Sequence, residues 1–265
     1  MNSLVYTNDR YDTTPGQPSL GARLFPSFLF YSRFMTIVWK ASAKSKRNTY
    51  TSSDWCDSCL EILHALEKSG IRISLSGIEY LRELDSPCVV IANHMSTLET
   101  VILPCIILPF REVTYIVKQS LLEYPIFKHV MRNCNPVGVG RTNPREDLKA
   151  VLHGGVERLN QGTSMIVFPQ TTRTHHFDPD QFNSIGIKLA LKAKVPVLPL
   201  ALKTDAWGNG KRLKDFGKMD GSKPVRLAFG EPIPVTDRGK EAHQAVVDFI
   251  SGQLSQWQQK TVASD

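Results

Sequence analysis

The sequence has little cysteine and no arrangement of residues that is typical of a metal site. It holds five cysteines, with a single C-x-x-C from Cys56 to Cys59, and no H-E-x-x-H motif. A lone C-x-x-C is weak evidence for zinc or redox chemistry, and its spacing suits two positions near one face of a helix. The cluster between His175 and Asp180 lacks a clear strong ligand from elsewhere. We therefore predict no metal, no resident cofactor and reduced cysteines.

Acidic residues are absent between positions 21 and 50, where aromatic and aliphatic residues are common instead. Pro26 and Arg33 interrupt the apolar stretch 24–39, which is too short for a confident membrane-spanning helix and lacks the cleavage site of a signal peptide. Aromatic residues beside cations are typical of a segment that lies in the interface of an anionic membrane. The alternative is a core helix followed by a solvated basic tail. The flanking cations are Arg23, Lys40, Lys44, Lys46 and Arg47.

The overall composition is that of a folded protein. The chain has 265 residues, of which 42% are hydrophobic and 22% charged, and this is enough to bury the core of one domain. A net charge of +7 favours an anionic membrane or a nucleic acid as partner, but no nucleic-acid recognition motif occurs, so we predict no nucleic-acid partner. We expect a loose terminus over 1–20, a membrane-associating segment over 21–53 and the main domain over 54–260.

Helix-like and strand-like segments alternate after residue 54. Asp54 is the expected N-cap of a helix that ends near Ser69. Near-continuous apolar strands between amphipathic helices predict a single α/β domain, with a mostly parallel or mixed central sheet flanked by helices and an N-terminal membrane-interface helical segment. The prolines of the strand at 195–202 suggest an edge or bulged position. The other expected strands are 87–92, 113–117, 164–168 and 225–229, and the other expected helices are 119–132, 145–161, 182–193 and 240–257.

His94 directly follows a predicted strand, and Glu99 lies five positions later. A histidine with a nearby carboxylate is the usual pair of a general base and the acid that orients it, and in α/β folds such residues lie just beyond strand ends. His175 and His243 also precede an acid by five positions, so this spacing alone does not identify the base. His243 lies inside a predicted amphipathic helix, where a packing or surface role is expected, whereas His175 follows a strand and is expected to border a site.

Four segments together resemble the motifs of one enzyme family. The run from Asn93 to Glu99 (NHMSTLE) resembles the first block of the glycerolipid acyltransferases, the 1-acylglycerol-3-phosphate acyltransferase group. Residues 138–141 (GVGR) resemble the second block, 168–174 (FPQTTRT) the third and 195–200 (VPVLPL) the fourth. The blocks come in the order of the family, and the similarity covers roughly residues 75–235. One block would be weak evidence, whereas four in order identify the chain as resembling this family.

The resemblance implies a reaction and roles for its residues. His94, with Glu99 as its acid, would deprotonate an acceptor hydroxyl that attacks a thioester of coenzyme A or acyl carrier protein. Arg141 and Arg173 would bind the acceptor's phosphate, because a guanidinium matches phosphate oxygens, and Lys118 at another strand end is a weaker candidate. The acceptor would be a lipid at the cytoplasmic face of a membrane, with acyl carrier protein as a further partner. The other substrate-binding positions would be Asn93, Gln170, Thr171 and Thr172.

The chain departs from the family's pattern at two places. Glu99 replaces aspartate, and it also completes an S-x-x-E capping box with Ser96, so an orienting role and a capping role are both open. Gln170 and Thr171 replace glutamate and glycine, which removes a charge and adds a branched side chain. Lysophosphatidic acid is the leading acceptor. The alternatives are an acyltransferase or thioester hydrolase with a non-phosphate acceptor, and a catalytically silent, membrane-docked lipid-binding protein.

Overall fold

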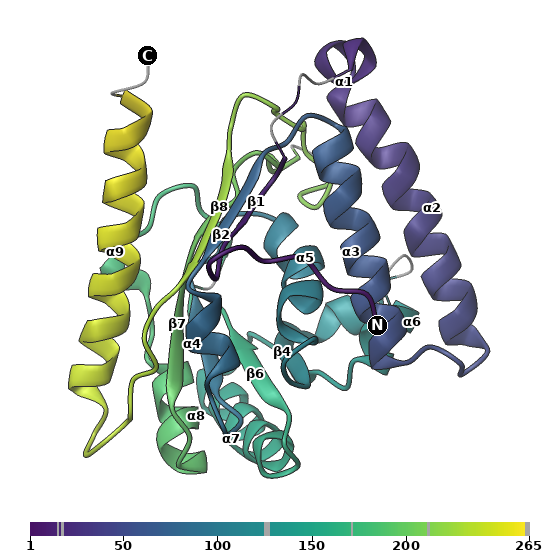
Figure 1. Cartoon of the computed structure of the whole chain (residues 1–265). Coiled ribbons are helices and arrows are strands. Elements are labelled where there is room, and N and C mark those ends of the chain that lie inside the picture. The colour runs from purple at the N-terminus through teal and green to yellow at the C-terminus, as the bar shows by residue number, and fades with distance from the viewer. Residues whose placement is uncertain (15, 17–18, 125–127, 171, 211–212, 263–265) are drawn as a thin grey trace.

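A mixed sheet lies at the centre of the molecule (Figure 1). A computed structural model describes residues 1–262 except 15, 17–18, 125–127, 171 and 211–212, with side chains described to residue 259. In this part of the chain the sheet has eight strands in the order β1-β2-β8-β7-β3-β6-β4-β5. The strands are β1 (Tyr11–Asp12), β2 (Ile73–Ser76), β3 (Val89–Ala92), β4 (Val113–Lys118), β5 (Val137–Val139), β6 (Ser164–Val167), β7 (Val197–Lys203) and β8 (Val225–Phe229).

Five neighbouring strands of this sheet run in one direction. β7, β3, β6, β4 and β5 pair in parallel, one after the other. β8 is antiparallel to β7, β2 is parallel to β8, and β1 is antiparallel to β2. The prediction of a mixed α/β sheet is therefore confirmed. Because the carboxyl ends of parallel strands meet at one edge, the segments that follow β3, β6, β4 and β5 collect there.

Helices cover both faces of the sheet, as the hydrophobic strands predict (Figure 1). Alternate residues of β3 serve the two layers: Val90 and Ala92 belong to a core with α2, α3 and α5, whereas Val89 and Ile91 belong to one with α7, α8 and α9. The helices are α1 (Leu20–Leu24), α2 (Pro26–Lys46), α3 (Ser52–Lys68), α4 (Ile78–Arg82), α5 (Leu98–Ile107), η1 (Gln119–Leu122), α6 (Lys128–Asn133), α7 (Pro144–Asn160), η2 (Pro179–Gln181), α8 (Ile185–Ala193) and α9 (Lys240–Val262).

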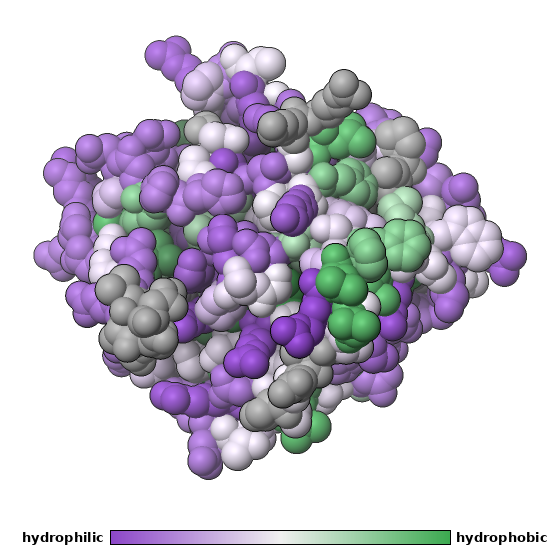
Figure 2. All heavy atoms as spheres, turned by 90° about the horizontal axis from the view of Figure 1, so that it is seen from above, coloured by the Kyte–Doolittle hydropathy of each residue, from purple (hydrophilic) through white to green (hydrophobic). Residues whose placement is uncertain are grey.

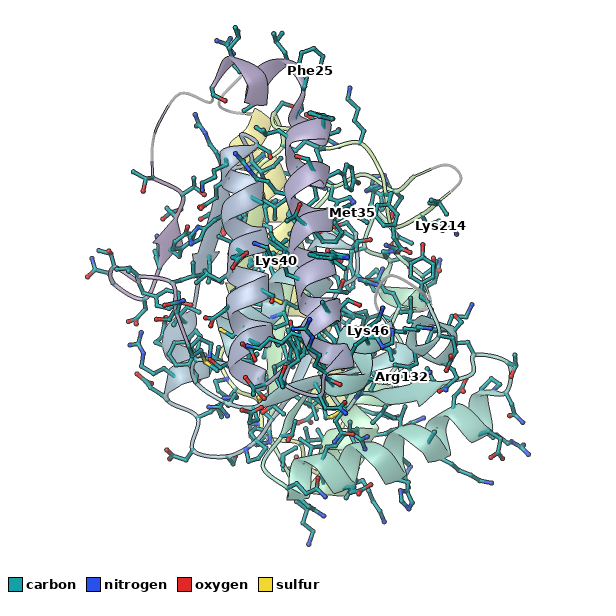
Figure 3. All side chains as sticks on the ribbon, turned by 90° about the vertical axis from the view of Figure 1, so that its right-hand side faces the viewer. Phe25, Met35, Lys40, Lys46, Arg132 and Lys214 are labelled. Atoms are coloured by element: carbon teal, nitrogen blue, oxygen red, sulfur yellow. The ribbon has the colours of Figure 1, made fainter. Side chains whose placement is uncertain are left out.

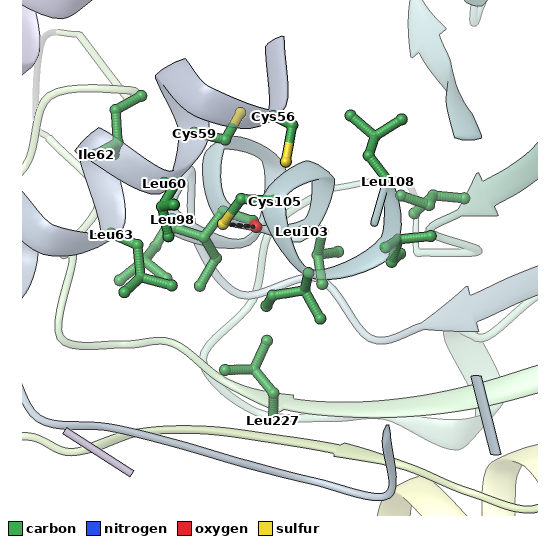
Figure 4. Close-up of a cluster of buried hydrophobic side chains, with 14 of the residues drawn as sticks. Cys56, Cys59, Leu60, Ile62, Leu63, Leu98, Leu103, Cys105, Leu108 and Leu227 are labelled. Carbon is green, nitrogen blue, oxygen red and sulfur yellow. Dashed lines mark hydrogen bonds between the residues drawn. The ribbon is translucent and has the colours of Figure 1, made fainter. Parts of the chain in front are cut away.

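Helix α3 begins three residues earlier than Asp54 predicts. Thr51 is the N-cap, its side chain accepts from the N–H of Asp54, and the Asp54 carboxylate accepts in return from the N–H of Thr51. The prediction of Asp54 as N-cap is wrong because the same aspartate serves at the third position of a capping box. Cys56 and Cys59 lie on the buried side of α3, near Cys105 of α5 (Figure 4), and all five cysteines are free and buried.

Strand β7 lies inside the sheet, between β3 and β8, and not at an edge. Its Pro199 has no N–H, and its carbonyl accepts from the N–H of Gly230, just after β8 ends. The N–H and C=O of one strand residue point to the same side, so the missing donor of Pro199 faces the point where pairing with β8 stops. The edge prediction is therefore wrong, because the proline lies at the end of one neighbour and leaves the pairing with β3 intact.

The N-terminus is packed against the domain and is not loose over its described first fourteen residues. Leu4 is buried, and β1 pairs with β2 through Tyr11 and Leu75. The hydroxyls of Tyr11 and Thr13 both donate to Glu67 of α3, at 2.5 and 2.7 Å. These polar residues look loose in the sequence because their partners lie about 55 positions away in the chain.

Helix α2 joins the predicted membrane-associating segment to the core. Phe30, Phe34 and Ile37 are buried on one side of α2, against α3 and Trp207. Phe28 and Trp39 lie on the other side and are 77% and 72% exposed. Within the described residues, none of the helices has the length and apolar character to cross a membrane. One face of α2 thus belongs to the core, as the core-helix alternative predicts, while an interfacial location stays a prediction for the exposed face.

Candidate active site

The end of β3 aims His94 out of the sheet. Asn93 follows the strand, and its side chain continues the pairing with β7, because Nδ2 donates to the carbonyl of Leu202 and Oδ1 accepts from the N–H of Leu202, both at 2.8 Å. Asn93 is 1% exposed. We predicted that Asn93 binds substrate, but the structure uses both of its polar atoms to hold the strand exit from which His94 projects.

His94 and Glu99 form a hydrogen-bonded pair. The Nδ1 of His94 lies 2.9 Å from Oε1 of Glu99; the carboxylate has no exposed surface, whereas 16% of the histidine side chain is exposed. Glu99 lies in the first turn of α5, which begins immediately after the loop that carries His94. An ionised carboxylate can only accept, so Nδ1 carries a hydrogen, and in the neutral imidazole the lone pair is then on Nε2. This is the tautomer that a general base requires.

The Glu99 carboxylate accepts hydrogen bonds on both of its oxygens. Oε1 also accepts from the backbone N–H groups of Met95 and Ser96, at 2.6 and 2.8 Å. Oε2 lies 2.6 Å from the hydroxyl of Thr204 and 2.9 Å from that of Ser96. Burial alone would raise the pKa of Glu99, but the hydrogen bond and charge of His94, with the bonds from Thr204 and Ser96, hold this pKa below its ordinary value. Glu99 therefore both orients His94 and binds the loop's N–H groups.

The third block packs against the other side of His94. The Phe168 ring stacks on the imidazole, with ring centroids 4.3 Å apart. Gln170 accepts from the N–H of His94 at 2.6 Å and donates to the hydroxyl of Thr174 at 2.7 Å. The N–H of Thr174 in turn donates to the carbonyl of His94. Gln170 thus holds the His94 loop, a role beyond the predicted contact with substrate.

Arg173 lies close to the same loop and is held by two partners. Its Nη1 donates to the hydroxyl of Thr97, and its Nη2 donates to Oδ1 of Asp215 at 2.7 Å. The side chains of Arg173 and Asp215 are 18% and 25% exposed. We predicted that Arg173 binds the acceptor's phosphate, and the structure shows a carboxylate of the protein bound at this guanidinium.

The two other predicted cations lie at the carboxyl ends of β5 and β4, at the same edge of the sheet. Arg141 is exposed and has a left-handed backbone with φ of +60°, and its N–H donates to Asp147 of α7 at 2.9 Å. Asp147 also accepts from the N–H of Gly140, so it fixes the second block's turn. Lys118 is the exposed last residue of β4. Spatial strand order places these cations progressively further from His94.

A cavity of about 470 Å³ adjoins the histidine loop. Gln170 lines it and also bonds His94, so the cavity and the His94–Glu99 pair share a wall. Thr172 lines it too, whereas Thr171 lies outside the described residues. His175 borders this cavity, as expected. His243, on α9, packs near Phe182, with ring centroids 6.1 Å apart. The cavity is lined by Gln170, Thr172, Thr174, His175, His176, Asp178 and Gln181.

Three residues outside the four sequence blocks also bond to residues of the site, and the sequence analysis did not predict them. Thr204 reaches Glu99 from the end of β7, and Asp215 reaches Arg173 from the connection between β7 and β8. Both lie more than 40 positions from the side chain that they bond, and no local motif marks them. Asp147 could have been found, because it follows the GVGR block in the first turn of a predicted helix. No group of three potential metal ligands occurs in the part of the chain that the structure describes.

Known proteins show the same fold and related sequences. The sequence model of the Acyltransferase family matches residues 72–203. The 1-acyl-sn-glycerol-3-phosphate acyltransferase of Pseudomonas aeruginosa is 31% identical over 155 residues, which are 58% of this chain and 58% of that one. The probable 1-acyl-sn-glycerol-3-phosphate acyltransferase of Mycoplasma pneumoniae is 29% identical over 63% of this chain and 64% of its own length. This chain therefore spans roughly three fifths of the length of these two relatives.

A solved structure extends the comparison to most of the chain. The 1-acyl-sn-glycerophosphate (LPA) acyltransferase of Thermotoga maritima superposes with a TM-score of 0.65 over 89% of this chain and 95% of that one, at 20% identity. At this identity the likeness shows the fold. The matched residues 72–203 include all four blocks and the His94–Glu99 pair. The family match, the related sequences and the shared fold show that this chain belongs to the glycerolipid acyltransferase family.

Proposed function

We propose that the chain transfers a fatty acyl group from a thioester to the hydroxyl of 1-acylglycerol-3-phosphate or a similar lysolipid, with His94 as general base. The single observation that carries this proposal is the pairing of His94 Nδ1 with the buried, ionised Glu99, which leaves the lone pair on Nε2. Chemistry of this kind needs a base that is oriented before substrate binds, and the pair provides one.

The reaction is balanced with the groups named. The acceptor oxygen attacks the thioester carbonyl and forms the new C–O bond while Nε2 of His94 takes its proton. The C–S bond then breaks, and the imidazolium of His94 gives the proton to the leaving thiolate. Glu99 stays ionised throughout and stabilises the imidazolium that forms between the two steps. The thioester is that of coenzyme A or of acyl carrier protein, and no resident cofactor is required.

The acceptor's phosphate would bind at the carboxyl edge of the parallel strands. Arg141, Lys118 and Arg173 lie at or just beyond the ends of three neighbouring strands there, and each carries a positive charge. A phosphate bound at this edge keeps the glycerol hydroxyl on the side of the sheet where His94 projects. Arg141 supports bidentate contact with phosphate because its backbone is fixed by Asp147.

The lipid acceptor would be reached from the cytoplasmic face of a membrane that the chain binds through α1 and α2. Phe25 and Phe28 are 65% and 77% exposed at this end of the molecule, and Figure 2 shows apolar side chains gathered on the side of α1 and α2. In Figure 3, Phe25 lies at one end of α2 and Lys46 at the other, with Met35 and Lys40 between them. Exposed aromatic residues next to cations support binding to anionic lipid.

Substitution of His94 tests the proposed chemistry. We expect His94→Ala to lower the turnover number by about 10²–10⁴-fold, because the substitution removes the base. Thiol release from acyl-CoA with 1-acylglycerol-3-phosphate measures this, and mass spectrometry of products from a mixed pool of lysolipids identifies the acceptor. His243→Ala is the control, since His243 lies on α9, where it packs near Phe182 and does not line the cavity. Full activity of folded His94→Ala would overturn the assignment.

A second function, with an acceptor that has no phosphate or with water as acceptor, is favoured by Gln170. Its amide is uncharged and both of its polar atoms bond within the protein, so it does not supply the charge of the family's glutamate. Arg141→Ala separates the two functions. Phosphate recognition predicts a large rise in the acceptor's Michaelis constant in this variant, whereas a phosphate-free acceptor predicts almost no change.

A further inference from the structure

Asp215 is a carboxylate at the position where an acceptor phosphate is expected. Its Oδ1 accepts from Nη2 of Arg173 at 2.7 Å, and the hydroxyl of Thr97 bridges to both side chains, 3.5 Å from the same Oδ1. Thr97 lies three residues after His94, so this trio adjoins the reacting base. The guanidinium therefore faces a negative charge before any ligand arrives.

The structure holds Asp215 in place from both sides of the segment that carries it. The N–H of Phe216 donates to the carbonyl of Leu213, and the carbonyl of Gly217 accepts from the hydroxyl of Tyr31 at 2.5 Å. The Phe216 ring also packs on Tyr31, with centroids 5.8 Å apart. The two residues after Asp215 thus contact α2, while Asp215 itself bonds Arg173 of the site. The contact between Asp215 and Arg173 is therefore fixed by the fold.

A phosphate monoester near neutral pH carries between one and two negative charges and competes with a carboxylate for the same guanidinium. With Asp215 bound, one face of Arg173 is occupied and its charge is largely balanced. An uncharged headgroup has no such conflict. The contact consequently lowers the advantage that a phosphate-bearing acceptor would otherwise gain from Arg173.

We propose that Asp215 is a specificity-determining residue of this site, which weakens recognition of phosphate-monoester headgroups by competing for Arg173. The proposal rests on the proposed function, since it concerns the acceptor of the same reaction. The connection between β7 and β8, which lies outside the residues 72–203 that match the family model, would then contribute to the choice of acceptor. The remaining cations at the edge, Arg141 and Lys118, then contribute most of the attraction for phosphate.

Two acceptors that differ in the phosphate alone test the proposal. In Asp215→Asn, we expect the Michaelis constant for 1-acylglycerol-3-phosphate to fall about tenfold, because a like charge beside the phosphate is removed from a partly exposed site. The constant for the uncharged 1-acylglycerol should fall much less, so the ratio of the two constants should change by about tenfold. Asp215→Glu, which keeps the carboxylate, should resemble the native chain.

Binding of glycerol 3-phosphate gives a readout that needs no turnover. Calorimetric titration of the full chain should show about tenfold tighter binding in Asp215→Asn than in the native protein. Asp220→Asn is the matched control, because it removes the same charge from the same connection and Asp220 bonds Ser222, not Arg173. Circular dichroism and thermal unfolding verify the fold of each variant, with Asp215→Ser as a second substitution.

The outcomes separate this proposal from the proposed function. Unchanged or weaker binding of glycerol 3-phosphate by folded Asp215→Asn and Asp215→Ser overturns the role of Asp215, whatever the activity. The same gain in Asp220→Asn also overturns it, since the effect would then be one of net charge. No turnover by the native chain with either acceptor contradicts the proposed function, while the binding difference still decides the role of Asp215.

Discussion

Glu99 is a charged side chain without exposed surface, and its neighbours explain how it stays ionised. Burial opposes the charge, and donors from His94, Ser96 and Thr204 offset that penalty. The carboxylate thus has three roles in the loop. It orients His94, accepts from backbone N–H groups and bonds Thr204 at the end of β7. Replacement of the family's aspartate by a longer side chain is compatible with all of these contacts in this structure.

The stability of the chain should depend on the protonation of Glu99. The pKa of Glu99 is lower in the folded than in the unfolded state, so the unfolded state binds the proton first and the stabilisation is lost as the pH falls through the folded pKa. The free energy of unfolding should therefore differ most between the native chain and Glu99→Gln at neutral pH, and the difference should shrink at acid pH. Urea denaturation of both proteins from pH 7 downward measures it. A difference that is constant with pH would contradict the prediction.

At the scale of elements, the connection between β7 and β8 does more than join two strands. It supplies Thr204 to Glu99, Asp215 to Arg173 and the carbonyl of Gly217 to Tyr31 of α2. Trp207 of the same connection packs on Phe30 in the core. The connection therefore contacts both α2, the predicted interfacial helix, and the site, through residues between Thr204 and Gly217.

Close approach within this connection predicts a strong effect at one glycine. A Cβ at Gly217 would lie 1.6 Å from the backbone carbonyl oxygen of Gly208, so Gly217→Ala should destabilise the chain by several kcal/mol, about 3 or more. Gly252→Ala is the contrasting change, because a Cβ added at Gly252 would meet open space, and inside α9 the alanine should stabilise by about 0.5–1 kcal/mol. Thermal and urea unfolding measure both. Similar midpoints for the two variants would contradict the close approach.

At the scale of the whole molecule, α2 presents exposed apolar residues and cations on one surface. The exposed face of α2 carries Phe28, Met35 and Trp39, and Lys40 and Lys46 follow along the same helix (Figure 3). The opposite face of α2 is buried against α3, so the helix is fixed to the domain while it presents this surface. A membrane bound here would lie against the helix that also contacts the connection between β7 and β8.

Substitution on this surface should weaken binding to vesicles. We expect Phe28→Ser with Trp39→Ser to lower partitioning onto anionic phospholipid vesicles by at least about tenfold, because each aromatic side chain contributes roughly 1.5–3 kcal/mol when it leaves water. Co-sedimentation at two salt concentrations measures both the apolar and the electrostatic parts. Val5→Ser is the control, since Val5 is equally exposed but lies outside α1 and α2. Equal binding by all three proteins would exclude this surface.

Much of the site could be predicted from local sequence because its chemistry is local. His94, Ser96 and Glu99 lie within six residues, and an apolar strand directly before them predicts where they project. The predicted bounds of β8, 225–229, are confirmed. They could be read from the sequence because the apolar residues of a strand that is covered on both faces follow one another closely. The prediction that the N-terminus is loose is wrong for the first fourteen residues, because polar side chains such as Tyr11 bond to partners on α3, far along the chain.

The sequence by itself determined the α/β class, the family and the histidine with its acid, because periodicity and short motifs are properties of neighbouring residues. The tertiary structure alone decided that β7 is central, that Thr204 completes the shell of Glu99 and that Asp215 occupies Arg173. These contacts join segments between 42 and 105 positions apart. Which distant polar groups meet depends on strand order and on the path of a connection, and no local pattern encodes either of them.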